Sequence, residues 1–358
     1  MIKISVIIPV FNTEKYLKEC LDSVINQSLI DIEIICINDG SSDKSFEILT
    51  DYESGDNRFK IINQTNKGLS ESRNIGIKHS TGEYILFLDS DDYLELNALN
   101  NLYDIATSKN SDLILFKIIN FSNEEFRDEY FDMQFLKEII GDNTFNWMDV
   151  KDKLFDISVT APGKLFKRKL IENIEFPKNL IFEDNLFFIK TIFNAKKVFF
   201  YDEYLYHRRI RKNSITNSNF EKYSDVIEIF NLIEEYIKSI GYHEEFKLQL
   251  FYKKTKNIFD KFSKVDKKNK EKFFNLIKKD FIRYNDVDLS GANKRSLFIL
   301  HSALNSNNSM EFENKINQYD AKIKNKKLQS EINTLKNSNS RKITKPIRKF
   351  FKYFIKDD

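Results

Sequence analysis

Residues 82–94 read GEYILFLDSDDYL and join a short apolar run to a cluster of acidic side chains. The apolar run YILFL has the length of a β-strand, and its lack of alternation is typical of a strand buried on both faces. Asp89, Asp91 and Asp92 follow it directly. Carboxylates this close repel one another unless a cation neutralises them, and hard oxygen ligands suit Mg²⁺ or Mn²⁺. The alternative is helix capping, which would need only one of these aspartates.

Four further apolar runs have strand length: KISVIIPV (3–10), IEIICIN (32–38), FKIIN (59–63) and LILFKII (113–119). In the segments between these runs, apolar residues recur at the spacing of an amphipathic helix. Repeated β-α-β units with short loops predict an α/β fold, with a mostly parallel, Rossmann-like sheet and helices on both faces.

The predicted strands end in polar residues. Phe11–Asn12 ends the first strand, Asn38–Asp39 the second and Asn63–Gln64 the third. Because open α/β sheets bind ligands at the carboxyl ends of their strands, these residues predict one shared crevice. Asp39 is placed there to accept hydrogen bonds from a base or a ribose. No GxGxxG follows the first strand and GxxxxGK[ST] is absent, which argues against a dinucleotide fold and a P-loop enzyme.

Four segments, SVIIPVFN (5–12), INDGSSD (37–43), NKGLSESRNIG (66–76) and GEYILFLDSDDYL (82–94), resemble family 2 glycosyltransferases in order and spacing. The resemblance covers roughly residues 1–215 and implies the GT-A fold. It also implies an inverting enzyme that uses a nucleotide sugar, with a UDP-linked hexose or N-acetylhexosamine expected. The acceptor would be a hydroxyl of a cell-surface glycan or of a lipid-linked molecule.

The resemblance assigns residues that bind the donor and a divalent cation, Mn²⁺ or Mg²⁺. It places Asp39 on the nucleotide base. Asp89 and Asp91 match the DxD signature, whose last aspartate holds the cation that bridges the donor diphosphate. Arg73 would lie close to the donor, the alternative being a surface helix residue. The other donor-binding positions that the matching segments imply are Pro9, Phe11, Asn12, Glu14, Lys67 and Ser90, with Asp92 as a supporting group.

Residues 163–171 and 176–188 resemble the acceptor side of the same family, which ends in a Glu-Asp pair. Glycosyl transfer needs a carboxylate that takes the proton of the acceptor hydroxyl. We expect Asp184 to be this base and Glu183 to orient it or the acceptor. The alternative is that both carboxylates only favour the start of a helix. Lys164 is the acceptor-side candidate, although many relatives carry Trp where this chain has Ala161-Pro162-Gly163.

The segment YLYHRRIRKNSIT (204–216) resembles the family's flexible loop, which closes over the diphosphate. Arg209, Arg211 and Lys212 would bind the concentrated negative charge of the leaving group. His207 is a candidate metal ligand, as in some relatives. The alternative is a packing residue beside Tyr206.

The sequence predicts a domain order of 1–220 (GT-A domain, donor half 1–120 and acceptor half 121–220), 221–310 (helical), 311–340 (polar helix) and 341–358 (basic amphipathic tail). The spacing of apolar residues in the polar helix falls short of a coiled coil, so weak self-association is the most it predicts. The tail combines seven Lys and Arg residues with six large apolar ones. This combination predicts an anionic membrane surface as partner. The alternatives are a helix docked on the protein and an RNA-binding segment.

The composition excludes several classes of protein. The net charge of +3 does not by itself indicate a nucleic-acid partner, and two cysteines exclude a disulfide framework. No stretch approaches the ~20 apolar residues of a membrane-spanning helix. We therefore expect a cytoplasmic protein, peripheral on the inner face of the cell membrane. The alternative to an enzyme is a non-catalytic glycan- or nucleotide-sugar-binding scaffold of the same fold, against which the intact acidic residues argue.

Overall fold

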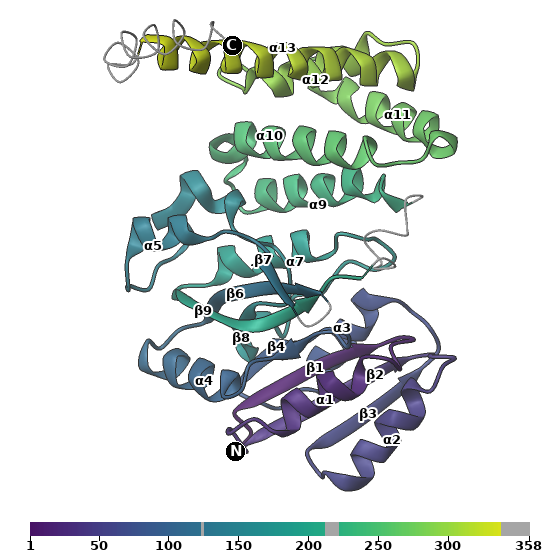
Figure 1. The fold of residues 1–358 in the computed structure, drawn as a ribbon, viewed down its shortest axis with the longest axis vertical. Coiled ribbons are helices and arrows are strands. Elements are labelled where there is room, and N and C mark those ends of the chain that lie inside the picture. Colours follow the sequence, from purple (N-terminus) through teal and green to yellow (C-terminus); the bar gives the residue numbers. More distant parts are fainter. Residues whose placement is uncertain (123–124, 212–221, 338–358) are drawn as a thin grey trace, which may run out of the picture. The chain divides into compact units, whose positions relative to one another are not determined.

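The computed structural model describes residues 1–122, 125–211 and 222–337 (Figure 1). One compact unit spans Met1–Lys261, and a second begins at Phe262. The tail predicted over 341–358 lies outside the described residues. Among the helices that are described, none has the length and apolar character needed to cross a membrane.

The first unit is built on a mixed sheet with the strand order β3-β2-β1-β4-β8-β6-β9-β5, and β7 pairs with β6. The strands are β1 (Ile4–Val10), β2 (Ile32–Asp39), β3 (Phe59–Gln64), β4 (Tyr84–Phe87), β5 (Tyr93–Leu94), β6 (Leu113–Ser122), β7 (Glu125–Glu129), β8 (Lys164–Lys167) and β9 (Val198–Arg209). The first four strands of the chain are parallel neighbours, as predicted. The strand at the fifth predicted run, β6, is separated from β4 by β8, which runs antiparallel to both.

Helices cover both faces of this sheet, and α9 packs on α7. The helices are α1 (Leu17–Ile25), α2 (Ser45–Gly55), α3 (Leu69–His79), α4 (Ala98–Ser108), α5 (Gln134–Ile140), the 3₁₀ helix η1 (Trp147–Asp156), α6 (Arg168–Ile171), α7 (Asp184–Asn194), α9 (Asp225–Ser239) and α10 (His243–Phe262). Val6 and Ile8 of β1 pack into one core with α1, α2 and α4, whereas Ile7 packs into the other with α3, α7 and α9. Two-sided burial explains why the strand sequences are continuous apolar runs.

The second unit contains α11 (Lys267–Phe281), the 3₁₀ helix η3 (Ile282–Tyr284), α12 (Lys294–Leu304) and α13 (Ser309–Asn337). Phe274 and Phe312 are buried with their ring centroids 5.5 Å apart, and Arg295 pairs with Asp320 at 2.8 Å. Every residue of α13 from 321 to 334 is exposed.

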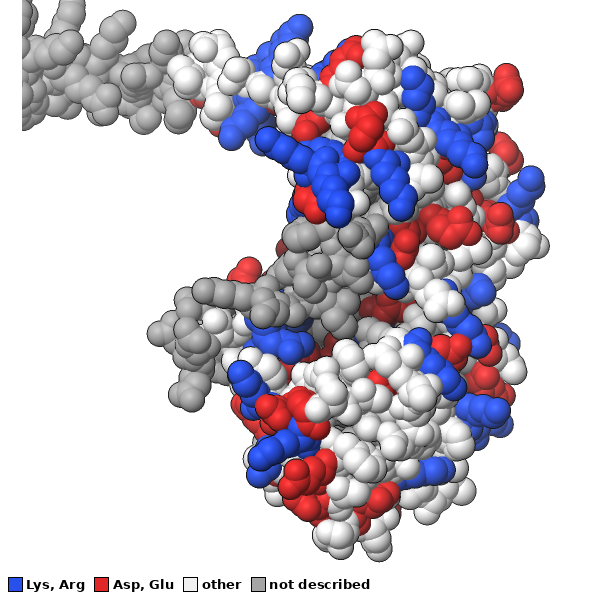
Figure 2. All heavy atoms as spheres, turned by 90° about the vertical axis from the view of Figure 1, so that its right-hand side faces the viewer, with Lys and Arg blue, Asp and Glu red and all other residues white. Residues whose placement is uncertain are grey.

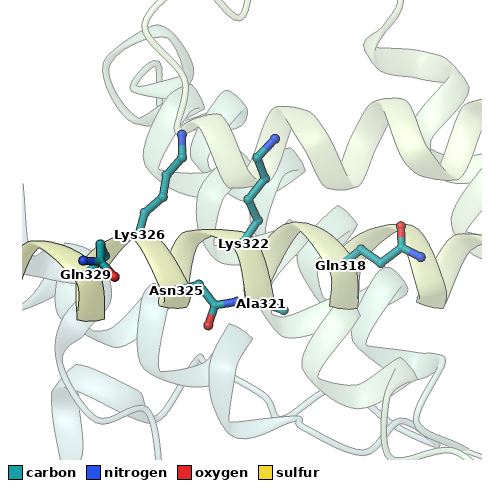
Figure 3. Close-up of a pocket in the computed structure, with 6 residues that line it drawn as sticks. All are labelled: Gln318, Ala321, Lys322, Asn325, Lys326 and Gln329. Carbon is teal, nitrogen blue, oxygen red and sulfur yellow. The ribbon is translucent and has the colours of Figure 1, made fainter.

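A shallow depression lies along α13, and all of its lining residues belong to this one helix: Gln318, Ala321, Lys322, Asn325, Lys326 and Gln329 (Figure 3). None of the predicted site residues lines it. Figure 2 shows acidic and basic side chains interspersed on the face it presents, in line with the small net charge of +3.

The close packing of α3 on β1 yields a stability prediction. A Cβ on Gly76 would lie 2.3 Å from Cγ2 of Ile7, which is fully buried. We expect Gly76→Ala to lower the free energy of unfolding by about 1–3 kcal/mol, as overpacking does, measured by urea denaturation. Gly55→Ala is the matched control, because Gly55 is also helical and a Cβ there would meet no atom within 4 Å. Equal stability of the two variants would contradict the packing argument.

Candidate active site

Asp39, at the end of β2, is buried and holds the turn that precedes α3. Its Oδ1 accepts hydrogen bonds from the backbone N–H of Lys67 at 2.7 Å and from Nε2 of Gln64 at 2.8 Å. Its Oδ2 accepts one from the N–H of Gly68 at 2.8 Å. Gly68 has φ +88°, a conformation that favours glycine. The carboxylate therefore fixes where α3 begins.

Asn12 and Glu14 connect the loop after β1 to the start of α2. Oδ1 of Asn12 accepts a hydrogen bond from the N–H of Ser42 at 2.8 Å, and Oε2 of Glu14 accepts one from the N–H of Lys44 at 2.9 Å. Asn12 has φ +52°, which asparagine tolerates better than most residues. These contacts join two neighbouring strand ends into one wall of the site.

Four other predicted donor-binding residues differ in exposure. Pro9 is buried within β1, whereas Phe11 is 45% exposed and Lys67 is exposed. Ser90 is buried, and its Oγ accepts a hydrogen bond from Oγ1 of Thr13 at 3.0 Å. Phe11 and Lys67 are thus the members of this set that present their side chains to a ligand.

Asp92 is the most buried member of the acidic cluster and anchors β9. Its Oδ2 accepts a hydrogen bond from the hydroxyl of Tyr206 at 2.7 Å, and its Oδ1 accepts one from the N–H of Arg209 at 2.8 Å. Burial raises the pKa of Asp92 well above its usual range, and the charges of Asp91 and Asp89 raise it further. Asp92 therefore supports the site rather than facing a ligand.

Asp91 forms an ion pair with Arg211, whose Nη2 lies 2.5 Å from Oδ2 of Asp91. Burial raises the pKa of Asp91, and so does the charge of Asp89, whereas Arg211 lowers it. Arg209 donates from Nε to the backbone carbonyl of Asp91 at 3.0 Å. Both guanidinium groups lie over the ring of Tyr16, at 4.9 Å for Arg209 and 5.3 Å for Arg211. The acidic cluster and the basic end of β9 thus meet at one place.

Arg73, on α3, is only 2% exposed and binds three carboxylates. Its Nη1 lies 2.9 Å from Oε1 of Glu183 and 2.7 Å from Oδ1 of Asp184, and its Nη2 lies 3.1 Å from Oδ1 of Asp89. The guanidinium also lies 5.3 Å from the ring centroid of Phe176. Burial would lower the pKa of Arg73, but the charges of Asp184, Asp89 and Glu183 raise it above its usual range. Arg73 is therefore a buried cation and not a surface helix residue.

Glu183 and Asp184 stand at the start of α7, where negative charge favours the helix. Glu183 precedes the first helical residue, and Asp184 lies in the first turn. Oδ2 of Asp184 accepts a hydrogen bond from the N–H of Ala161 at 3.2 Å. Burial raises the pKa of Asp184, and Arg73 opposes this shift. Burial and the charge of Asp184 raise the pKa of Glu183 to about 7.

Lys164 points into the protein. It is 1% exposed, its Nζ donates to the backbone carbonyl of Thr160 at 2.5 Å, and it lies 4.9 Å from the ring centroid of Phe188. Burial lowers the pKa of Lys164 to about 7, although the charge of Asp184 opposes the shift. Lys164 therefore does not present its side chain to the surface, where the sequence placed it as an acceptor-side candidate.

His207 packs on β5. Its Nε2 lies 2.8 Å from Oε2 of Glu95, and its ring stacks on Tyr93 with centroids 4.4 Å apart. Lys212 lies outside the described residues.

Asp89 and Asp91 are the carboxylates that fit a hard divalent cation. Among the described residues, no group of three or more His, Cys, Asp or Glu side chains is arranged to hold a metal ion. Two carboxylates are nevertheless sufficient where substrate phosphates and water complete the coordination, as is usual for Mg²⁺. The oxygen ligands of these two side chains are of the hard type that suits Mg²⁺ or Mn²⁺.

Three contacts of the site were not predicted from the sequence: Tyr16 with Arg211, Tyr206 with Asp92, and Glu95 with His207. Each contact joins residues from separate elements, so no local sequence pattern indicates which residues meet. Tyr206 and His207 are neighbours on β9, so the segment 204–216 indicated the region but not these partners.

Comparison with known proteins agrees with this geometry. A family model described as glycosyl transferase family 2 matches residues 5–174. Glycosyltransferase GlyA of Streptococcus pneumoniae is 32% identical over 228 residues, which cover 62% of this chain and 32% of GlyA. Glycosyltransferase GlyG of the same organism is 29% identical over 270 residues, which cover 67% of this chain and 90% of GlyG. The chain therefore spans about a third of the one relative and most of the other.

Among solved structures, S. aureus TarS 1–349 in complex with UDP-GlcNAc is similar to this chain. Its TM-score is 0.69 at 23% identity, and the match covers 89% of this chain and 92% of TarS 1–349. The mixed sheet and its helices match the GT-A fold, which confirms the predicted fold class. The family-model match and these relatives support the resemblance of the sequence segments to glycosyl transferase family 2.

The position of Glu183 yields a prediction about stability and pH. Its folded-state pKa of about 7 exceeds the ordinary 4.5, so the folded protein binds this proton more tightly than the unfolded chain. This group therefore makes wild-type stability fall as pH rises from about 4.5 to 7. The Glu183→Gln variant lacks this titrating carboxylate. Its free energy of unfolding minus that of wild type should therefore increase from pH 5 to pH 8, as measured by urea unfolding at both pH values.

Glu235→Gln, which changes an exposed glutamate of α9, is the control, and its difference from wild type should vary little between the two pH values. If Glu183→Gln behaves like this control, Glu183 is not the buried, charge-penalised group described above.

Proposed function

We propose that this enzyme is an inverting, metal-assisted glycosyltransferase. It moves a hexosyl or N-acetylhexosaminyl group from a UDP-linked donor to a hydroxyl of a cell-surface glycan or lipid-linked acceptor. One observation carries the proposal: the guanidinium of Arg73 binds Asp89 of the donor side and Asp184 of the acceptor side, at 3.1 and 2.7 Å. The carboxylate proposed for the donor cation and the proposed base are therefore held by a single side chain.

On the acceptor side, Asp184 accepts the proton of the attacking hydroxyl. The acceptor oxygen forms its bond to the anomeric carbon as the bond to the diphosphate breaks, so one displacement inverts the configuration. Asp184 suits this role because Arg73 and the N–H of Ala161 fix both of its oxygens. Glu183 shares Arg73 and orients the base.

On the donor side, Asp89 and Asp91 would hold Mn²⁺ or Mg²⁺, with His207 the weaker candidate because it already pairs with Glu95. Such a cation would neutralise the negative charge that develops on the departing diphosphate. Arg209, at the end of β9, and Arg211, two residues further on, would bind the same group, and the sequence adds Lys212 to this proposed set.

The nucleotide would lie along the ends of β1 and β2. Asp39 and Asn12 already form hydrogen bonds within the chain, so they would shape this pocket as well as line it. The exposed ring of Phe11 offers a face for the base. UDP-GlcNAc in TarS supports a UDP-linked donor, and Pro9, Glu14, Lys67 and Ser90 complete the proposed set.

The base assignment is tested by Asp184→Asn. This change keeps the shape of the side chain and the contact with Arg73 but removes the proton acceptor. We expect transfer to fall by ~10²–10⁴-fold, while UDP binding in the presence of Mn²⁺ changes little. Single-turnover transfer and calorimetric UDP titration measure the two effects.

Asp152→Asn, at an exposed position of η1, is the control and should leave transfer unchanged. If Glu183→Gln retains UDP binding and abolishes transfer while Asp184→Asn stays active, the base is Glu183.

For residues 341–358 we propose reversible binding to an anionic membrane surface, close to a lipid-linked acceptor. Seven cations and six large apolar residues support this partner, since each cation near such a surface contributes ~1 kcal/mol. We expect the full chain to sediment with phosphatidylglycerol vesicles at low salt and to be released as salt screens the charges.

Phosphatidylcholine vesicles and a chain that ends at residue 337 are the controls, and neither should show binding. A full-length protein that stays in the supernatant with phosphatidylglycerol at low salt contradicts the membrane proposal. Loss of folding on removal of the tail would instead indicate a docked helix.

A further inference from the structure

The carboxylate proposed for the divalent cation already has a cationic partner within the chain. Nη2 of Arg211 lies 2.5 Å from Oδ2 of Asp91, and the two side chains are 24% and 15% exposed. The guanidinium thus already neutralises the carboxylate that is proposed to hold the metal ion. Arg211 and a cation on Oδ2 would also repel each other, strongly at this degree of burial. Arg211 and the metal therefore compete for Asp91.

Arg211 is held by fewer contacts than its neighbour on β9. Arg209 donates to the carbonyl of Asp91, pairs with Glu19 and lies over two rings, those of Tyr16 and Phe121. Among the described residues, Arg211 forms one ion pair, lies over Tyr16, and has a buried Nε that makes no hydrogen bond. An anion that accepts a hydrogen bond from this Nε–H would therefore favour a movement of the Arg211 side chain toward it.

Building on the proposed function, we propose that Arg211 is a positioning residue that occupies Asp91 until a nucleotide diphosphate and its cation arrive together. Arg211 then exchanges the carboxylate for the diphosphate, with its guanidinium still beside the ring of Tyr16. Asp91 would then be available, together with Asp89, to hold the cation. The exchange makes cation and nucleotide binding cooperative, because the diphosphate supplies the charge that lets Arg211 leave.

The test uses Arg211→Gln in the full chain, with free Mn²⁺ followed by electron paramagnetic resonance. Without nucleotide, Mn²⁺ should bind this variant about tenfold more tightly than it binds wild type, since no guanidinium competes for Asp91. In saturating Mn²⁺, UDP should bind the variant about tenfold more weakly, because the diphosphate has lost a cationic partner. The two effects have opposite signs, which general damage to the site would not produce.

Two matched variants isolate the effect. Arg168→Gln removes the same charge elsewhere in the first unit, where this side chain pairs with Glu172 and donates to the backbone carbonyl of Gly82. It should change nucleotide-free Mn²⁺ affinity by less than about twofold. Arg211→Lys keeps the charge and should restore weak nucleotide-free Mn²⁺ binding, which separates charge from folding defects.

Mn²⁺ binding to Arg211→Gln that equals or falls below wild type overturns the inference, while Mn²⁺-dependent UDP binding by wild type leaves the proposed function standing. If wild type binds no Mn²⁺ even with UDP, the metal-assisted function fails and the inference fails with it.

Discussion

The site depends on one buried cation. Arg73 is 2% exposed, and a charge at that depth is tolerated only when partners surround it. Asp89, Glu183 and Asp184 provide those partners at 2.7–3.1 Å. Removing one partner from such a buried pair typically costs about 3–5 kcal/mol, so these contacts fix the relative placement of their elements. One guanidinium also cannot neutralise three carboxylates, which leaves a net negative charge beside Asp91.

The position of Arg73 is set by contacts that fix α3, the helix that carries it. Asp39 fixes the turn that starts α3, and the close approach of Gly76 to Ile7 sets α3 on β1. The antiparallel insertion of β8 between β4 and β6 completes the sheet on the acceptor side. The N–H of Ala161, shortly before β8, then reaches Asp184. The donor and acceptor halves thus meet at Arg73 because the sheet continues without interruption between them.

The parallel strands and the polar sheet edge were predictable from the sequence. The pattern of apolar residues along a strand and the residue types at its end are local signals. Continuous apolar runs identified the parallel strands, and polar strand ends identified the sheet edge that carries Asp39 and Asp89. The partners of Arg73 were not predictable, since Glu183 and Asp184 lie 110 and 111 residues away and only the assembled sheet joins them. The pair of Arg211 with Asp91 and the platform formed by Tyr16 are likewise tertiary contacts. The short strand β8 carries too few residues to show a period of its own.

A crystal structure of the full chain with UDP and Mn²⁺ tests the central claim most directly, because the anomalous signal of manganese locates the cation independently of the protein atoms. The account predicts manganese on Asp91, beside Asp89 and in contact with the diphosphate, and Arg73 still bound to Glu183 and Asp184. Manganese bound away from Asp89 and Asp91, or a nucleotide complex in which Arg73 no longer joins Asp89 to Asp184, would contradict it.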